Sequence, residues 1–216
     1  IVIYVSIIQY TEFHRFTYCF IIKQMKMDLA NFIQDNLFSS SEIIKHSISL
    51  LDNIQDSILL VTDTIKNGNK IILFGNGGSA ADAQHIAAEL IGRFKLERQS
   101  YPAISLSTDT SVITSLGNDY SFDVIFSRQC ESLVQKNDLV IGISTSGNSK
   151  NVENGLKTSK KLGAKTIGLL GNNGGKIGNI VDIAIIVNSS LTDRIQEAHR
   201  TIYHIICDAS EQILTK

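Results

Sequence analysis

Five short apolar runs, separated by longer polar segments, constrain the fold of this chain more than any other feature. Short runs of this kind, bounded by glycine or polar residues, are typical of strands buried on both faces of a parallel sheet. The runs are Lys70–Phe74, Ala103–Leu106, Leu139–Ile143, Thr166–Leu170 and Ile183–Val187.

Segments of helix length follow these runs. They are Ala80–Phe94, Phe122–Val134, Asn151–Leu162 and a final amphipathic stretch at Thr192–Leu214. This alternation predicts an α/β fold with one five-stranded parallel sheet, flanked by helices on both faces and connected by right-handed crossovers. In such sheets ligands bind beyond the carboxyl ends of the strands, so we expect the functional residues there.

The residues before the first run predict N-terminal helices over 28–67. Ser39-Ser40-Ser41-Glu42 offers capping residues, and apolar residues recur at helical spacing until Asn67-Gly68 interrupts them. We expect one domain at 27–216, with its α/β core at 69–216. Met25 and Met27 directly precede the helical pattern, so residues 1–26 are expected to be a non-native segment read through from upstream, with no function assigned.

Composition and charge argue against several partners. Hydrophobic residues make up 43% of the 216 residues and charged residues 19%, as in ordinary globular proteins. The formal net charge of −1 offers no basic surface, so we expect no nucleic acid partner. Charged residues interrupt the apolar N-terminal stretch well short of a membrane span, so we expect no membrane partner. The three widely spaced cysteines, Cys19, Cys130 and Cys207, fit free thiols and a cytoplasmic location.

The loop after the first run permits two interpretations. Gly75-Asn76-Gly77-Gly78-Ser79-Ala80 matches the G-x-G-x-x-A pattern of dinucleotide-binding turns, and Asp109 could be the acid that binds a ribose. The plainer interpretation is a tight turn that needs glycine at positive φ. A single match of this kind is a weak signal, and we expect no nucleotide cofactor.

The loop after the third run indicates a phosphate site. Ser144-Thr145-Ser146-Gly147-Asn148-Ser149 places four hydroxyl groups between a strand and the start of a helix, where backbone N–H groups and the helix dipole favour an anion. The chain has no G-x-x-x-x-G-K-[ST] motif, so a phosphomonoester fits better than a nucleoside triphosphate. Helix capping alone is the alternative, but one hydroxyl is enough for a cap.

Two helices carry candidate acid–base or metal-binding residues. His85 and Glu89 stand four residues apart on one helical face, and Gln196 and His204 share a face of the last helix. These side chains can bind a metal such as Zn²⁺ if the two helices converge, they can act as acid and base without a metal, or each histidine can simply pack between helices. His199 falls off the shared face and is interpreted as structural or supporting.

Five motifs together resemble the SIS (sugar isomerase) family and, within it, the phosphoheptose isomerases, over the chain from about Asp28 to its end. They are Gly75-Asn76-Gly77-Gly78-Ser79, His85-Ile86-Ala87-Ala88-Glu89, Gly117-Asn118-Asp119, Ser144-Thr145-Ser146-Gly147-Asn148-Ser149 and Asp193-Arg194-Ile195-Gln196-Glu197-Ala198-His199. The resemblance implies a homotetramer with active sites between subunits. It also implies the conversion of sedoheptulose 7-phosphate to D-glycero-D-manno-heptose 7-phosphate through a cis-enediol, which feeds the heptose of lipopolysaccharide core or other surface glycans.

The resemblance also implies roles for particular residues. Glu89 and His204 are the expected catalytic pair. In some members of the family one zinc ion per subunit is bound by the residues that match His85, Glu89, Gln196 and His204. The substrate-binding residues that it implies are, around the phosphate, Ser144, Thr145, Ser146 and Ser149, and, around the sugar, Asn76, Gly77, Gly78, Ser79, Glu89, Asn118, Asp119, Asp193 and Gln196.

Two other classes of protein compete with this hypothesis. The first is a regulatory, non-enzymatic SIS protein of the type that associates with the replication initiator, a branch that lacks the catalytic carboxylate and the final-helix histidine. Glu89 and His204 are both present here, which favours an enzyme. The second is a dinucleotide-dependent oxidoreductase, which would leave the loop Ser144–Ser149 unexplained.

Overall fold

The computed structural model of the chain describes residues 27–216, which divide into two compact units. The described residues of the first unit, 27–42, are helical. The second unit, 43–216, contains the α/β core. The expectation that residues 1–26 are a read-through segment concerns residues outside those described.

All five predicted strands form, and they lie in one parallel sheet in the order β2-β1-β3-β4-β5, which confirms the predicted fold class. The strands are β1 (Ile71–Gly75), β2 (Ala103–Ser105), β3 (Leu139–Ser144), β4 (Lys165–Gly171) and β5 (Ile183–Val187). The chain adds β2 on one side of β1 and then crosses to add β3 on the other side. The topological switch point, where such sheets bind ligands, therefore lies between β1 and β3.

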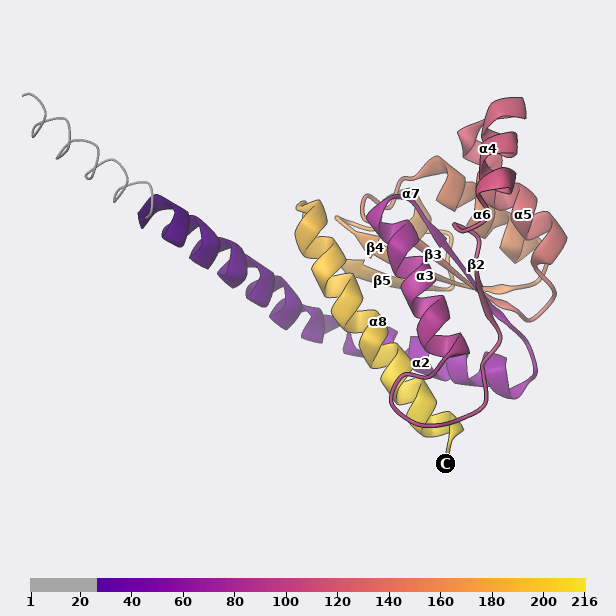
Figure 1. Ribbon diagram of the computed structural model, residues 1–216, viewed down its shortest axis with the longest axis horizontal. Coiled ribbons are helices and arrows are strands. Elements are labelled where there is room, and N and C mark those ends of the chain that lie inside the picture. The colour runs from indigo at the N-terminus through magenta and orange to yellow at the C-terminus, as the bar shows by residue number, and fades with distance from the viewer. Residues whose placement is uncertain (1–26) are drawn as a thin grey trace, which may run out of the picture. The chain divides into compact units, whose positions relative to one another are not determined.

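Helices cover both faces of this sheet (Figure 1). Because successive strand residues point to opposite faces, Leu139 and Ile141 of β3 join one core and Val140 joins the other. The first core lies against α2 (Leu51–Lys66), α3 (Gly78–Ile91) and α8 (Thr192–Leu214). The second core lies against α4 (Thr110–Asp119), α5 (Ile125–Leu133), α6 (Lys150–Lys161) and α7 (Gly175–Gly178).

Helix α4 was not predicted from the sequence. Its first residues are Thr, Ser, Val, Ile and Thr, which have modest helix propensity. Asp109 caps this helix, because its side chain accepts a hydrogen bond from the backbone N–H of Val112 at 3.0 Å. The residue considered above as a ribose-binding acid is therefore a helix cap in the structure.

The boundaries of the remaining helical segments differ slightly from the predicted ones. Residues 43–46 are helical, and the 3₁₀ turn η1 (Ser47–Leu50) leads into α2. The helix predicted at Phe122–Val134 begins as the 3₁₀ turn η2 (Phe122–Val124) before α5. Among the described residues, no helix is both long and apolar enough to cross a membrane.

Candidate active site

The loops after β1 and β3 meet at the topological switch point. The amide nitrogen Nδ2 of Asn76 donates to Oδ1 of Asn151 at 2.9 Å, and Nδ2 of Asn151 donates to Oδ1 of Asn76 at the same distance. This reciprocal pair joins the end of β1 to the first turn of α6, so the two predicted binding loops lie close to each other at this edge of the sheet.

Glycines shape the first of these loops. Gly77 has φ +55°, a region that L-residues rarely occupy, and it directly precedes α3. A Cβ on Gly78 would stand 2.5 Å from Nε2 of Gln196, so glycine at this position lets the start of α3 touch α8. Ser79 is buried, and its backbone N–H bonds the carbonyl of Asn76 at 3.0 Å. The loop is a tight turn, as the plainer interpretation held.

The hydroxyl groups of the second loop converge. Oγ of Ser144 lies 2.9 Å from Oγ of Ser149 and 3.4 Å from Oγ of Ser146. Ser149 is the N-cap residue of α6, yet its side chain makes no capping hydrogen bond. The hydroxyls therefore face one another at the start of a helix and do not serve as its cap, which is the arrangement expected of an anion site.

Neighbouring turns hold this loop in place. Gly147 has φ +65°, and a Cβ there would stand 2.3 Å from the backbone carbon of Gly174. Nδ2 of Asn172 donates to the carbonyl of Thr145 at 3.1 Å, and the backbone N–H of Lys176 donates to Oδ1 of Asn148 at 3.1 Å. An open polar cleft of about 750 Å³ adjoins the loop and is lined by Ser146, Asn148, Asn172, Asn173, Asn188, Ser189 and Ser190.

Three of the four candidate metal ligands come together between α3 and α8. The ligand atoms of His85, Glu89 and His204 all lie within 4.8 Å of one another. Nε2 of His85 is 2.9 Å from Oε1 of Glu89, and the rings of His85 and His204 meet edge to face with centroids 5.1 Å apart. The side chains of His85 and Glu89 are 40% and 22% exposed, so the cluster is accessible from solvent.

The two helices run in parallel and in register. Gly78 meets Gln196 near both N-termini, and His85 meets Tyr203 seven residues further along each helix. Gln196 thus lies two helical turns before His204, against the start of α3.

Histidines on α8 differ in their electrostatic surroundings. Burial, and then the nearby His85, lower the pKa of His204 from its ordinary value, which keeps this imidazole neutral near pH 7. His199 is fully buried, and its Nε2 lies 2.9 Å from the carbonyl of Leu170. Burial lowers the pKa of His199 to about 4. His199 therefore contacts the sheet, consistent with a structural role.

A buried ion pair braces the end of α3 that carries Glu89. The carboxylate of Glu211 accepts hydrogen bonds from the backbone N–H groups of Phe94, Lys95 and Leu96 and from Nε of Arg98. Nη2 of Arg98 in turn donates to the carbonyl of Glu89 at 2.9 Å. Sequence reasoning did not identify this brace, because its partners lie more than a hundred residues apart.

Sequence reasoning assigned no role to Asp82, Arg200 and Tyr203, which form a hydrogen-bonded group that contacts His85 through Tyr203. Nη2 of Arg200 donates to Oδ1 of Asp82 at 3.0 Å, and the hydroxyl of Tyr203 lies 3.0 Å from Nδ1 of His85. The position of Asp82, three residues before His85 on the same helix, was the one available signal.

Other predicted substrate residues lie apart from the cluster. Asn118 and Asp119 are exposed at the end of α4, where Nδ2 of Asn118 donates to Oδ1 of Asp119 at 2.8 Å. Asp193, in the first turn of α8, pairs with Arg194. Within the described residues, no hydrogen bond links these three side chains to His85, Glu89 or His204.

The chemistry of the cluster fits a divalent transition metal. Two imidazoles and one carboxylate are ligands that Zn²⁺ prefers, and bonds of about 2.0–2.2 Å to one ion bring such ligand atoms to within about 3–4 Å of one another. Ligand atoms within 4.8 Å reach that separation by small side-chain rotations. His85, Glu89 and His204 are therefore a group that can hold a metal ion.

Known proteins resemble this chain in sequence and in fold. A family model described as SIS domain matches residues 38–171. The chain is 56% identical over 155 residues to the phosphoheptose isomerase of Geobacter sulfurreducens, which spans 72% of this chain and 82% of that protein. It is 48% identical over 184 residues to the phosphoheptose isomerase of Campylobacter concisus. That match covers 85% of this chain and 97% of the Campylobacter protein. The structure of phosphoheptose isomerase from Neisseria gonorrhoeae superposes with a TM-score of 0.81 at 37% identity, covering 85% of this chain and 99% of that chain.

Proposed function

We propose that this chain, which belongs to the phosphoheptose isomerases of the SIS domain family, converts sedoheptulose 7-phosphate to D-glycero-D-manno-heptose 7-phosphate. One observation carries the proposal: the converging hydroxyls at the end of β3 lie beside the start of α8, and the same helix carries His204 of the carboxylate–imidazole cluster between α3 and α8. The regulatory alternative is not favoured, because that branch lacks counterparts of Glu89 and His204. The product supplies the heptose of lipopolysaccharide core or other surface glycans.

The loop Ser144–Ser149 binds the phosphate in this proposal. Ser144, Ser146 and Ser149 donate their hydroxyl hydrogens, and backbone N–H groups at Thr145 and the start of α6 complete the anion site. A phosphate displaces the contacts between the hydroxyls and replaces them with stronger charge-assisted hydrogen bonds.

The start of α8 links the phosphate loop to the reacting end of the sugar. A Cβ on Gly171 would stand 2.3 Å from the carbonyl oxygen of Thr145 and 2.5 Å from Cδ1 of Ile195, so α8 begins beside the loop. His204 lies nine residues after Ile195, about 13 Å along the helix at 1.5 Å per residue. A seven-carbon chain anchored by its phosphate can cover that span. The residues proposed to contact the hydroxyl groups of the sugar are Asn76, Gly77, Gly78, Ser79, Gln196, Asn118, Asp119 and Asp193.

Glu89 acts as the base. Its carboxylate removes a proton from C1 of the ketose, the C1–C2 double bond of a cis-enediol forms, and the C2 oxygen gains a proton. The same carboxyl group then returns its proton to C2 while the C1 hydroxyl loses one, which leaves the aldose. Oε1 of Glu89 is occupied by His85 in the structure, and no described residue bonds Oε2, the oxygen that faces the substrate in this mechanism.

His204 moves the oxygen-bound protons. Its lowered pKa leaves the ring neutral near pH 7, so it can accept a proton from one hydroxyl and deliver one to the neighbouring oxygen. The same groups assist opening of the sugar ring. A well-placed acid or base of this kind contributes roughly 10²–10⁴-fold to the rate.

One zinc ion per subunit is proposed to bind to His85, Glu89, Gln196 and His204. When bound, the ion polarises the O1 and O2 oxygens of the sugar. The donor types support this, since the three ligand atoms of His85, Glu89 and His204 already lie within 4.8 Å of one another. Dialysis against a chelator should abolish turnover and added Zn²⁺ should restore it. Full activity of metal-free protein would exclude a catalytic metal.

Self-association as a homotetramer is proposed as well. Within the helical residues 27–42, Leu29, Phe32, Ile33 and Leu37 share one face and are between 50% and 67% exposed. An apolar face of this kind is typical of a contact with another chain, and a second copy is the proposed occupant. Light scattering should report four subunits, and Phe32→Glu with Leu37→Glu should reduce that number. A monomeric wild-type protein would overturn the proposal.

A cytoplasmic location is proposed on chemical grounds. Cys130 and Cys207 are buried free thiols, and burial raises their pKa to about 11 and about 12, so both stay protonated and unreactive. Free cysteines fit a reducing compartment.

The deciding experiment is incubation with sedoheptulose 7-phosphate while aldose formation is followed by NMR. Unphosphorylated sedoheptulose serves as the matched control, and it should react far more slowly because it lacks the anchoring phosphate. No turnover of the phosphorylated ketose by zinc-loaded protein would refute the proposed reaction.

A further inference from the structure

The residue proposed as the base, Glu89, lies in the last turn of α3, which ends at Ile91. The carbonyl groups of a last helical turn lack partners within the helix, so this part of a helix frays unless other groups bond them. Nη2 of Arg98 donates to the carbonyl of Glu89 at 2.9 Å. Nη1 of the same side chain donates to the carbonyls of Leu90 at 2.9 Å and Gly92 at 3.2 Å. One guanidinium therefore caps the C-terminal end of α3, where the helix dipole also favours a positive charge.

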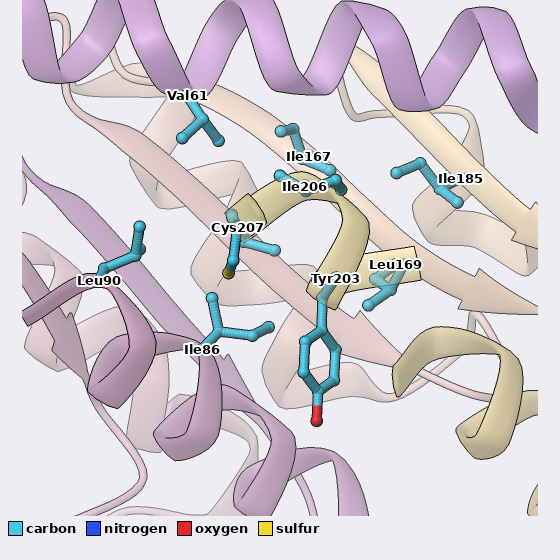
Figure 2. Close-up of a pocket in the computed structure, with 10 residues that line it drawn as sticks. Val61, Ile86, Leu90, Ile167, Leu169, Ile185, Tyr203, Ile206 and Cys207 are labelled. Atoms are coloured by element: carbon cyan, nitrogen blue, oxygen red, sulfur yellow. The ribbon is translucent and has the colours of Figure 1, made fainter. Parts of the chain in front are cut away.

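Apolar packing holds this turn only in part. Figure 2 shows Leu90 of α3 and Tyr203 and Cys207 of α8 around a small apolar cavity in the first core. A void leaves the side chains around it without contact atoms on one side. The place of the last turn of α3 therefore depends on the polar contacts of Arg98 as well as on the core.

Glu211 of α8 fixes the guanidinium of Arg98. The side chains of Glu211 and Arg98 are 1% and 4% exposed, and Oε1 of Glu211 accepts from Nε of Arg98 at 3.0 Å. The ring of Tyr101 covers the guanidinium, with its centroid 3.8 Å from Cζ of Arg98. The charge-assisted hydrogen bond and the aromatic ring together set the orientation of the donors that reach α3.

The same carboxylate reaches His204 by way of Phe94. Oε1 of Glu211 accepts a hydrogen bond from the backbone N–H of Phe94 at 2.8 Å. Oε2 accepts from the backbone N–H groups of Lys95 at 2.6 Å and Leu96 at 2.8 Å, so the loop after α3 is held against the C-terminal part of α8 (Figure 1). The ring of Phe94 consequently lies beside the imidazole of His204, with centroids 5.7 Å apart.

We propose that the Arg98–Glu211 pair positions both reacting groups of the proposed isomerase. Arg98 holds the turn of α3 that carries Glu89. Glu211 holds Phe94 against the ring of His204, so one buried pair sets the places of the base and of the histidine that moves protons. The inference rests on the proposed function, since it concerns the same site. Proton transfer needs a narrow range of geometries, and a displacement of about 1 Å can reduce the rate about 10²-fold.

Arg98→Lys and Glu211→Gln test this role. A lysine keeps the positive charge beside Glu211, but its single ammonium group cannot bond all the carbonyls of the turn at once. We expect kcat for sedoheptulose 7-phosphate to fall about 10- to 100-fold while KM stays within about twofold, because the phosphate loop is unchanged. Glu211→Gln should lower kcat to a similar extent, since it releases Phe94 as well as Arg98. Initial rates well below the unfolding temperature of each variant measure both constants.

Asp138→Asn is the matched control. Asp138 is a buried carboxylate too, 1% exposed, and it accepts from the backbone N–H groups of Lys70 and Gln135 and pairs with Nζ of Lys70. It directly precedes β3, at the opposite edge of the sheet from the loops of the site. Asp138→Asn should therefore lower stability and leave kcat unchanged. A kcat within about twofold of wild type in Arg98→Lys, or a loss no larger than that in Asp138→Asn, would overturn the inference.

NMR of metal-free protein gives a readout that does not depend on turnover. The ring of Phe94 shifts the C–H proton signals of His204 by its ring current, and a His204→Gln variant assigns those signals. Phe94→Leu keeps an apolar side chain, so it should remove this shift and also lower kcat. Glu211→Gln should remove part of the shift, and Asp138→Asn should retain it.

Unmoved His204 signals in Glu211→Gln, or an unchanged kcat in Phe94→Leu, would overturn the inference. Failure of the proposed function would look different: the His204 signals would respond as expected, but wild-type protein would leave sedoheptulose 7-phosphate unconverted.

Discussion

The two halves of this site are built in different ways. The phosphate loop is one continuous segment, Ser144–Ser149, whose hydroxyls meet because the chain turns from β3 into α6. The cluster of His85, Glu89 and His204 is assembled from two helices whose residues lie more than a hundred positions apart. A binding site can thus be local, but the reacting groups beside it depend on how α3 packs on α8.

The two halves are held in place by different contacts. The loop is held by its own turn and by neighbours such as Asn172. The cluster depends on remote supports, namely Tyr203 behind His85 and the Arg98–Glu211 pair at the end of α3. Changes in the loop should therefore affect substrate affinity, and changes around the cluster should affect turnover.

Loss of the Glu89 carboxylate should reduce turnover more than any other change considered for this site. Glu89→Gln removes the base but keeps the size of the side chain, so turnover of sedoheptulose 7-phosphate should fall by at least about 10²–10⁴-fold. Substrate binding, measured by calorimetry, should be retained because the phosphate loop is unchanged. Near-normal kcat in this variant would show that the cluster is not the reacting half.

The buried His199, which lies outside the cluster, should make the stability of the protein depend on pH in the acid range. Burial lowers the pKa of His199 to about 4, against 6.5 in the unfolded chain. Between these values the unfolded state binds a proton that the folded state does not. Stability should therefore fall as the pH drops from about 6.5 to about 4, by about 3 kcal/mol in all.

Urea unfolding at several pH values measures this dependence. His199→Gln keeps a side-chain donor for the Leu170 carbonyl but cannot titrate, so it should lose this part of the pH dependence. If the variant and the wild type lose stability equally on acidification, the buried histidine is not the cause.

Much of the fold could be predicted because strand and helix patterns are local. The helix Thr192–Leu214 and the strand Ile183–Val187 lie where their apolar periodicity placed them. Helix α4 was missed because its hydroxyl and β-branched residues form a poor helix by propensity alone, and the Asp109 cap and packing against the second core stabilise it.

In the candidate site, too, the local features could be predicted from the sequence and the contacts between distant residues could not. The serines of the loop were visible because their spacing is fixed by the chain. Asp82, Arg200 and Tyr203 were not, because a buried carboxylate is recognised only when its partners are known, and those partners come from another helix. Helical spacing placed His85 beside Glu89, but it could not show that His204 joins them.

A smaller effect is expected in the loop. Ser146→Ala removes one hydrogen bond to a charged phosphate, worth about 1.5–3 kcal/mol, so KM should rise roughly 10- to 100-fold while kcat stays within a few-fold. Ser115→Ala, which removes an exposed hydroxyl on α4, is the control and should leave KM unchanged. A fall in kcat with constant KM would contradict the assignment of the loop to binding, because the loop would then act on the reaction itself.

The smallest effect distinguishes a binding hydroxyl from a capping one. Ser149 occupies the N-cap of α6 without a capping hydrogen bond, whereas Asp109 caps α4 through Val112. Ser149→Ala should therefore change the free energy of unfolding by only a few tenths of a kcal/mol and raise KM, while Asp109→Ala should cost about 1 kcal/mol of stability and leave KM unchanged. Urea titrations and initial rates on the same preparations measure both quantities. If Ser149→Ala loses as much stability as Asp109→Ala with an unaltered KM, the hydroxyl caps the helix in solution and the phosphate must be held by Ser144, Ser146 and the backbone alone.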